Sequence, residues 1–473
     1  MIFLGKIMHA IIVRTQATET ARARKAAHTK LLPLAVAVVI TPLLLSDNVA
    51  AQDVDIHPSD LFETPQEGIE APLPRSSRDA DSWKDYTHLT LNAGVSGESN
   101  IFLDNDTNKE SDVIFSISPT LSFSTPGIGS GDQKLSVYYT PSYRVYSNNS
   151  DLNNLDHTFR FSFDNDSQIT LPKTTISFDL GYDQTQSSDR LNGGLVGRDS
   201  LNAGVRVSHR LSGKTSLNLS ASARTNSYDS PDRINRSFDS GNTNQRSDVD
   251  LLDDVEYNFR ASLNYQLTSK ISVGPYVGYG ITDVSGSGGG VDNNQDRISY
   301  SAGITGSYAA TGKTAFTGSV GWTSYEFDGP SSGSGSGNDS ITYTIGLSHQ
   351  LGPRTSLRAS LWRSYKPSNT IGNTSYIANG ASLSLNWRQS DRWNHSLSMT
   401  YENDDFFSDD PNGGGGTSDY INLRLSTRYQ ASDNLSFGAS ISSSTQNSNN
   451  TNDEALSDFE NWIFSINANY IFW

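Results

Sequence analysis

Arginine recurs at alternate positions of polar segments, often with Ser or Asn two residues away. Ten arginines share this pattern: Arg144, Arg160, Arg206, Arg210, Arg224, Arg260, Arg358, Arg388, Arg424 and Arg428. A guanidinium group is always charged and presents a fork of N–H donors that fits carboxylate and phosphate groups. If these side chains line one interior surface, they would attract anionic solutes or an acidic polymer and set selectivity.

A second interpretation of the pattern needs no selectivity. An arginine that faces lipid near the membrane midplane costs about 2–4 kcal/mol, so a membrane-spanning wall keeps arginine on its other face whatever its function. Few acidic residues share the arginine positions, Glu256 being one exception. The sequence therefore predicts cations that their wall neighbours do not neutralise.

No pattern in the sequence indicates a catalytic site. The histidines near predicted strands are His88, His157, His209, His349 and His395. Serine is so abundant that a neighbouring His carries almost no information about a nucleophile and its base. We expect neither enzymatic activity nor a cofactor.

Two acidic segments invite a metal hypothesis. Residues 104–108 resemble the start of a calcium loop, but Lys109 replaces the required Gly and no Glu stands at the twelfth position. A second cluster comprises Glu402, Asp404, Asp405, Asp409 and Asp410. Solvated hairpin loops explain both segments better than a metal site does.

The C-terminal segment, residues 459–473, shows which elements must position these side chains. Apolar residues alternate there with mostly Ser and Asn: Trp462, Phe464, Ile466, Ala468, Tyr470 and Phe472. A period of two indicates a β-strand with one apolar face. The alternation recurs from Tyr86 onward and predicts an all-β, transmembrane, antiparallel up-and-down β-barrel of about 18 strands, with 16 as the alternative.

Composition favours the barrel over a soluble fold. Only 35% of the 473 residues are hydrophobic, so a soluble fold would have few apolar side chains for its core. A barrel wall needs an apolar residue only at every second position, because its other face meets water. About 18 strands would leave room for an aqueous channel. A soluble sandwich or solenoid is the competing fold.

Six short turns divide the chain into hairpins. They begin at Leu211, Leu267, Ala310, Leu351, Gln389 and Ala431. Long segments rich in Asp, Asn, Gly and Ser, such as 229–250 and 403–418, lie between them. Short turns on one rim and long loops on the other are the outer-membrane arrangement, with the short rim in the periplasm. Both ends of the barrel chain then lie on the periplasmic side.

The alternation places strands at definite positions. They are expected near 85–97, 112–125, 133–146, 155–166, 174–186, 199–212, 215–228, 252–268, 271–284, 295–310, 314–328, 339–351, 355–367, 376–389, 393–407, 419–431, 435–447 and 459–473. Pro119 and Pro141 fall opposite one another on the outward faces of the second and third strands. Because proline cannot donate to the ladder, we expect a bulge or a weakened seam there.

The N-terminal residues precede the barrel. In residues 1–51, basic residues come before the apolar run 31–45, and Val49-Ala50-Ala51 predicts signal-peptide cleavage after Ala51. A retained anchor helix is the alternative, although the run is shorter than the ~20 residues that a helical span needs. Met8 or a later residue would be another start. Residues 52–83 are acidic and proline-rich and predict a disordered periplasmic extension, followed by the barrel over 84–473.

Charge and cysteine content exclude several classes of function. Without residues 1–51 the chain has 29 Lys and Arg against 49 Asp and Glu, a net charge of −20. Nucleic acid is therefore not an expected partner. The chain has no cysteine, so disulfides, thiol chemistry and Cys-ligated metals are excluded.

The N-terminal hairpins resemble those of a known family, the outer-membrane β-barrel porin type 2 family. The residues that carry the resemblance are Gly94, Asn100, Ile101, Phe102, Asp112, the Ser-Ile-Ser-Pro stretch at 116–119, Tyr138, Tyr139 and Tyr143. Members are bacterial outer-membrane barrels, some of them associated with exopolysaccharide production or export. Trp473 departs from the C-terminal pattern, since the outward parity ends at Phe472. The resemblance implies a Gram-negative outer-membrane location and a link to exopolysaccharide export.

These observations predict a porin-like protein that forms a passive polar channel. Expected partners are outer-membrane lipid, the barrel assembly machinery, and small hydrophilic or anionic solutes, including an acidic polysaccharide. The alternative is a structural or adhesive surface barrel with a plugged lumen and functional extracellular loops.

Overall fold

The structure is a computed structural model of the chain. It describes residues 86–103, 109–125, 133–166, 171–188, 190, 195–229, 253–285, 296–328, 338–367, 373–408, 416–449 and 458–472. The expectations for the signal peptide (1–51), for the acidic extension (52–83) and for the calcium-like segment (104–108) fall outside these residues.

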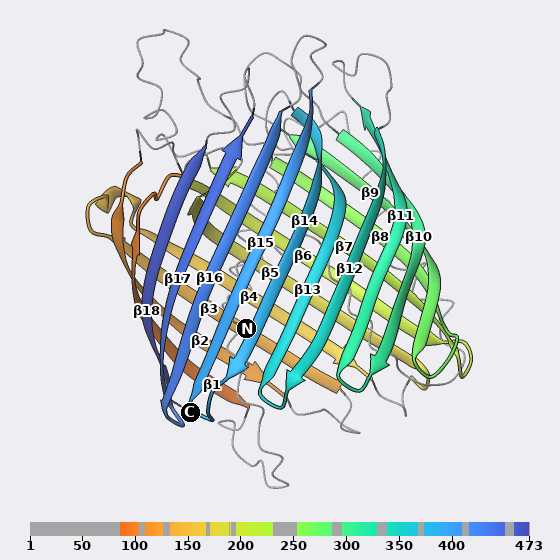
Figure 1. The fold of residues 1–473 in the computed structure, drawn as a ribbon, viewed down its shortest axis with the longest axis horizontal. Helices are drawn as coiled ribbons and strands as arrows, with labels where there is room; N and C mark the ends of the chain where they lie inside the picture. The colour runs from red at the N-terminus through yellow and green to blue at the C-terminus, as the bar shows by residue number, and fades with distance from the viewer. Residues whose placement is uncertain are drawn as a thin grey trace, which may run out of the picture. The chain divides into compact units, whose positions relative to one another are not determined.

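The described residues form an 18-stranded antiparallel barrel (Figure 1). The strands are β1 (Thr87–Glu98), β2 (Asp112–Ser124), β3 (Gln133–Tyr146), β4 (Asn154–Asn165), β5 (Thr174–Ser188), β6 (Leu195–Arg210), β7 (Thr215–Asp229), β8 (Asp253–Gln266), β9 (Ile271–Ser285), β10 (Asp296–Thr311), β11 (Thr314–Asp328), β12 (Asn338–Gly352), β13 (Thr355–Pro367), β14 (Asn373–Arg388), β15 (Trp393–Ser408), β16 (Thr417–Ser432), β17 (Leu435–Ser448) and β18 (Phe459–Ile471). A short 3₁₀ helix, Ser150–Leu152, precedes β4.

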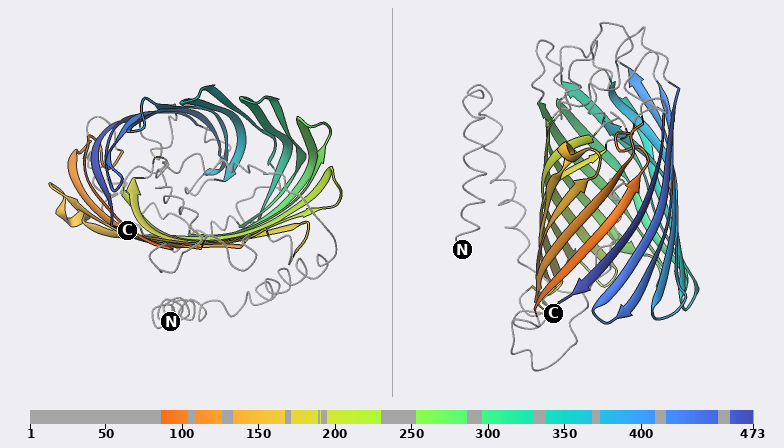
Figure 2. Two further views of the ribbon diagram at one scale, coloured as in Figure 1. Left: turned by 90° about the horizontal axis from the view of Figure 1, so that it is seen from below. Right: turned by 90° about the vertical axis from the view of Figure 1, so that its left-hand side faces the viewer.

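Each strand pairs with its sequence neighbours, and β1 pairs with β18 to close the ring (Figure 2). Closure leaves no unpaired sheet edge, which a structure in lipid requires because lipid offers no hydrogen bonds. The predicted number of 18 strands is confirmed. The largest difference in position is at β6, which begins at Leu195 and not near residue 199.

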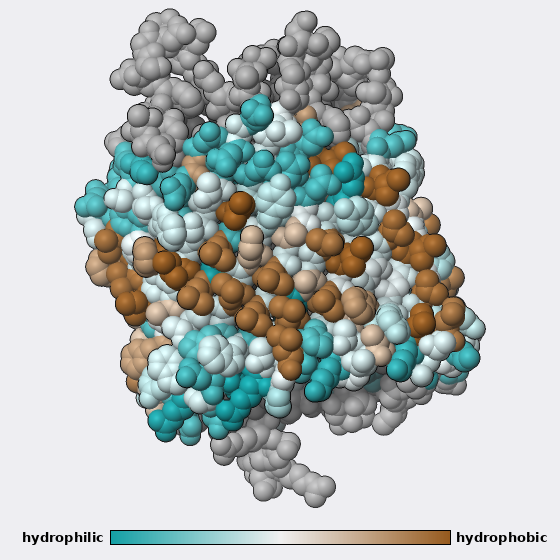
Figure 3. Space-filling model, viewed as in Figure 1, coloured by the Kyte–Doolittle hydropathy of each residue, from teal (hydrophilic) through white to brown (hydrophobic). Residues whose placement is uncertain are grey.

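The two faces of the wall meet different surroundings. Outward side chains include Leu383, Leu423 and Leu425, which are 42%, 46% and 51% exposed. These and similar residues form an apolar band across the middle of the outer face, with polar residues above and below it (Figure 3). Alternate residues of the same strands, mostly Ser, Thr, Asn and Arg, face inward. The predicted alternation is therefore confirmed.

One rim, called here the turn rim, carries the short turns. In four of them a hydroxyl oxygen accepts a hydrogen bond from the backbone N–H two residues later: Ser212 from Lys214, Thr268 from Lys270, Thr311 from Lys313 and Ser390 from Arg392. Ser and Thr favour such turns because their side chains can replace a backbone acceptor. The recurring sequence therefore encodes one recurring turn. The opposite edge, with the long connections, is called the loop rim.

The seam between β2 and β3 is interrupted at Pro119 and Pro141. Pairing runs up to Ile117↔Tyr143 and resumes at Leu121↔Tyr139 with unchanged register. The Ser147 N–H donates to Val113 O and the Thr125 N–H donates to Leu135 O. Hydrogen-bonded pairs recur every second residue, so the prolines occupy such a pair and both of its bonds are missing. The predicted weak seam is confirmed, without a bulge.

Inward hydroxyl groups bridge this interruption. Ser118 Oγ donates to Ser142 Oγ at 2.7 Å, and the Thr120 and Thr140 hydroxyls are 2.7 Å apart. Side chains thus hold the two strands together where the backbone ladder cannot.

Among the described residues, no helix is long and apolar enough to cross a membrane.

Candidate functional site

All ten predicted arginines lie at inward-facing positions of the wall. Register places them opposite inward polar residues, as in the pairs Arg206↔Ser220, Arg358↔Ser384 and Arg424↔Ser442. The outward neighbours of Arg424, Leu423 and Leu425, are exposed to the outside. That these ten arginines line the lumen and set its selectivity stays a prediction.

Several of these arginines are held by neighbours in the wall. Arg144 forms an ion pair with Asp156. The Arg160 Nη2 lies 2.6 Å from Asp183 Oδ2. The expectation that wall neighbours leave the cations unneutralised is therefore wrong for Arg144 and Arg160. Their partners lie on other strands, and the alternation within one strand does not reveal cross-strand register.

Two further arginines are restrained without an ion pair. Arg260 stacks over the Tyr276 ring, with 4.1 Å between the guanidinium carbon and the ring centroid. The Tyr276 ring in turn lies where a Cβ at Gly303 or Gly321 would stand, so these glycines leave room for the stack. Arg224 Nε donates to Asn226 Oδ1 at 3.2 Å.

A third group of arginines has no partner in the described part of the wall. Within the described residues, no hydrogen bond or ion pair involves the side chains of Arg206, Arg358, Arg388 or Arg424. Serine flanks these cations across the strands, as Ser177 and Ser220 do for Arg206. Guanidinium groups surrounded by hydroxyls can bind anions without first breaking an internal pair.

A buried ion cluster that the sequence did not predict lies inside the barrel near the loop rim. Arg190, between β5 and β6, donates from Nη2 to Glu402 Oε1 at 2.6 Å and to Asp404 Oδ2 at 2.7 Å. Lys366 Nζ lies 3.2 Å from Glu402 Oε2. Both acidic side chains are completely buried. The cluster balances two cations against two carboxylates.

Arg190 is also fixed by uncharged contacts. Gln446 Nε2 donates to the Arg190 backbone carbonyl at 3.1 Å. The guanidinium carbon of Arg190 lies 4.6 Å from the centroid of the Tyr420 ring. Burial alone lowers the pKa of Arg190, but the carboxylates of Asp404 and Glu402 outweigh burial and raise it. The side chain is therefore a permanent cation.

The wall beneath the cluster is shaped to receive it. Trp362 is 1% exposed and its Nε1 donates to Glu402 Oε2 at 3.3 Å. A Cβ on Gly380 would stand 2.0 Å from Cζ2 of Trp362. Only glycine therefore lets the indole lie against β14, and the indole helps to orient the Glu402 carboxylate.

The position of Arg190 requires the β5–β6 hairpin to leave the wall. Pairing of β5 with β4 stops at Gln184, whereas pairing with β6 continues to Ser188↔Leu195. Leu195 then packs in a buried apolar cluster with Ile101, Ile114, Tyr146 and Leu152, and Ser188 Oγ donates to Ile101 O at 2.7 Å. Arg190, which follows β5, thereby reaches inward residues of β15, β16 and β17.

The interpretation of Glu402 and Asp404 as solvated loop residues is wrong. Both belong to β15 and are sequestered by cations. Asp409 and Asp410 fall outside the described residues. Over the part of the chain that the structure describes, no group of three or more acidic or histidine side chains could hold a metal ion.

A closed antiparallel barrel with an apolar outer band and a polar interior is the architecture of outer-membrane porins. The described strands have this fold.

The solved structures to which the chain is similar include OpdO, OccK2 and FauA. OpdO of Pseudomonas aeruginosa shares 13% identity at a TM-score of 0.43, over 82% of this chain and 97% of that one. OccK2 of Pseudomonas aeruginosa, solved in complex with glucuronate, shares 11% at 0.43, over 82% and 98%. The alcaligin receptor FauA of Bordetella pertussis shares 13% at 0.39, over 81% and 76%.

No family model and no curated protein matches the chain. The resemblance to the β-barrel porin type 2 family therefore rests on the sequence features alone.

Proposed function

We propose that the chain is a passive polar channel of the Gram-negative outer membrane, without catalytic activity. The observation that carries this proposal is the inward face of the 18 strands, which is mostly polar, whereas large exposed apolar residues face outward. A barrel with this number of strands is wide enough to hold water in place of a packed core.

Arg190 narrows this channel near the loop rim. Its contacts with β15, β16 and β17 hold the Arg190 side chain inside the lumen. The same observation favours a second candidate, a surface barrel whose lumen is plugged. Single-channel recording of the refolded protein in a planar bilayer separates the two, since stepwise openings support a channel and a silent bilayer supports a plug.

The lumen prefers anions because Arg206, Arg358 and Arg424 face it without an acidic partner. Rings of fixed charge set ionic selectivity in pores. Neutralising all three to Gln should reduce the anion preference, seen as a shift of the reversal potential under a salt gradient. Arg392→Gln, on a turn of the turn rim, is the matched control. An unchanged reversal potential in the triple variant would reject this part of the proposal.

The solute class extends to an acidic polysaccharide. The family resemblance of residues 94–146 and the unpaired guanidinium groups of the lumen both support this proposal. A strain that lacks the chain should secrete less exopolysaccharide, and the triple Gln variant should restore secretion less well than the natural chain. Equal secretion with and without the chain would contradict a role in polysaccharide export. The proposal of a passive channel would not be affected.

We further propose how the chain reaches the outer membrane and what surrounds it there. Cleavage after Ala51 would release the mature protein, the barrel assembly machinery would insert it, and outer-membrane lipid would surround the apolar band. N-terminal sequencing of the purified protein tests the cleavage, and a first residue other than Gln52 would contradict it.

A further inference from the structure

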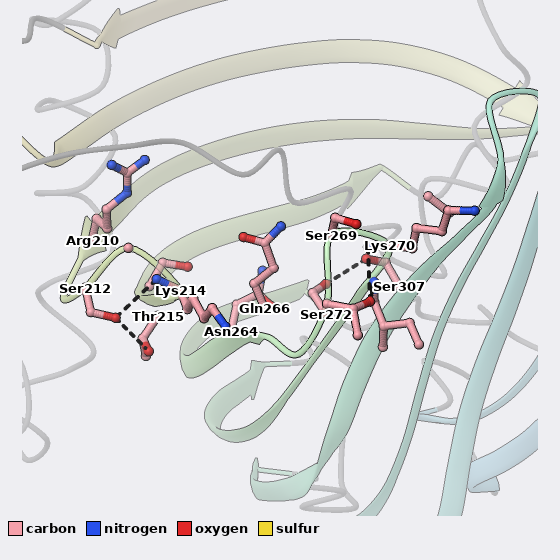
Figure 4. Close-up of a pocket in the computed structure, with 15 residues that line it drawn as sticks. Arg210, Ser212, Lys214, Thr215, Asn264, Gln266, Ser269, Lys270, Ser272 and Ser307 are labelled. Atoms are coloured by element: carbon pink, nitrogen blue, oxygen red, sulfur yellow. Dashed lines mark hydrogen bonds between the residues drawn. The ribbon is translucent and has the colours of Figure 1, made fainter.

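The turn rim carries a cationic pocket, separate from the Arg190 cluster near the loop rim. A cavity of about 400 Å³ lies between the turn that joins β6 to β7 and the turn that joins β8 to β9 (Figure 4). Its cations are Arg210, Lys214 and Lys270, and none of the residues that line it is acidic. Arg210, Asn264 and Gln266 occupy inward positions of their strands. The pocket therefore lies on the inner lip of the barrel.

Hydrogen bonds fix the groups around this pocket. Ser212 Oγ accepts from the Lys214 N–H at 3.2 Å, and Thr268 Oγ1 accepts from the Lys270 N–H at 3.2 Å. Beside these turns, the hydroxyl of Ser272 on β9 lies 2.7 Å from the hydroxyl of Ser307 on β10 (Figure 4). Both lysines thus project from ordered turns, and the Lys270 Nζ donates to Ala310 O on the next turn at 3.4 Å. No acidic residue lines the cavity.

The opposite arc of the same rim differs in charge. Arg354 Nη2 lies 3.4 Å from Asp391 Oδ1, so this turn cation has an acidic neighbour. Asp433 occupies the turn between β16 and β17. Acidic residues therefore stand in the turns of this arc, whereas none lines the pocket between β6 and β9.

We infer that this pocket binds the acidic N-terminal segment of the same chain, residues 52–85, an inference that rests on the proposed periplasmic position of the turn rim. The segment carries nine carboxylates and three cations. It joins β1 at the turn rim, because Leu89 pairs there with the C-terminal end of the barrel through the Phe472 N–H. Charge and connectivity therefore favour this occupant over a free solute.

The segment is long enough to reach the pocket. Its 34 residues span up to about 110 Å when extended. Strands spaced ~4.8 Å apart make an 18-stranded barrel on the order of 35 Å across. Because the segment is tethered, binding is intramolecular and its effective concentration is high. A bound segment would screen the cations at this mouth of the channel.

Disulfide trapping tests the inference cleanly, because the natural chain has no cysteine. Ser59→Cys is combined either with Ser269→Cys, in the turn beside the pocket, or with Ser432→Cys, in the turn on the opposite arc. The inference predicts that the first pair cross-links at least tenfold faster in the folded, detergent-solubilised barrel. Adding Lys214→Glu and Lys270→Glu to the first pair should abolish that advantage.

Three results would overturn the inference. Equal rates for the two pairs would mean that the tether alone brings the cysteines together. An advantage that survives the two charge reversals would mean that the lysines do not bind the segment. If full-length Ser269→Cys reacts with maleimide as fast as the same variant without residues 52–82, and only added polygalacturonate slows it, the pocket serves an acidic solute. None of these readouts depends on whether the barrel conducts.

Discussion

At the scale of residues, Arg190 has the largest consequence for the lumen. It lies between β5 and β6, yet it neutralises two completely buried carboxylates on β15. Removing one partner of a buried ion pair leaves an uncompensated charge and costs about 3–5 kcal/mol. That cost falls on the inward position of Arg190 and not on the barrel ladder, because Arg190 lies outside β5 and β6.

Arg190→Gln should therefore break these contacts and raise the single-channel conductance severalfold. Arg354→Gln is the matched control, since its ion pair with Asp391 is exposed and such pairs contribute about 0–1 kcal/mol. The measurement is the conductance of each variant in the same bilayer and salt. A conductance of Arg190→Gln equal to that of the natural chain would show that Arg190 does not narrow the lumen.

The sequence could not have revealed the Arg190 site. Arg190 and Glu402 are separated by 212 positions, and only the closed ring brings β5 and β15 into reach of each other. One feature of the sequence does indicate the site. Glu402 and Asp404 both occupy inward positions of β15, where buried carboxylates need cationic partners. The inward arginines, in contrast, were predictable, because alternation within one strand determines which face a residue occupies.

At the scale of elements, the β2–β3 seam shows how side chains compensate for a defective ladder. Pro119 and Pro141 remove both hydrogen bonds of one pair, and inward hydroxyl pairs flank the gap. The sequence predicted the seam because proline lacks the N–H, and the positions of both prolines followed from the strand period. The compensating hydroxyls were not predicted, because serine lines most of the inner wall.

Ser118→Ala should destabilise the barrel more than Ser360→Ala. Both serines form inward hydroxyl pairs of 2.7 Å, with Ser142 and with Ser382, but the β13–β14 ladder is continuous beside the second pair. A net hydrogen bond contributes about 0.5–1.5 kcal/mol. Of these two seams, the β2–β3 seam is the one whose backbone pairing is interrupted beside the hydroxyl pair.

The urea midpoint of unfolding for the refolded barrel measures this difference. Replacing Pro119 and Pro141 together by Val should reduce the cost of Ser118→Ala, because each new N–H can donate to the opposite carbonyl. Equal costs for Ser118→Ala and Ser360→Ala would show that the hydroxyl pairs do not compensate for the prolines.

At the scale of the whole molecule, the period of two residues accounts for most of the fold. It predicted 18 strands, and the structure contains 18. The largest error fell at β6, where Leu195 and Val196 continue the hairpin after β5 has left β4. That departure depends on packing against Ile101 and Ile114, and no sequence pattern within β6 indicates it.

The central claim is that successive residues of each strand meet different solvents, lipid outside and water within. Single cysteines at Leu423, Arg424, Leu425 and Ser426 of β16 test it most directly, because the natural chain has none. In lipid vesicles, a membrane-impermeant maleimide should label Arg424→Cys and Ser426→Cys through the lumen, while Leu423→Cys and Leu425→Cys should react only with a lipid-soluble reagent. Labelling of all four positions at similar rates by the impermeant reagent would contradict the account.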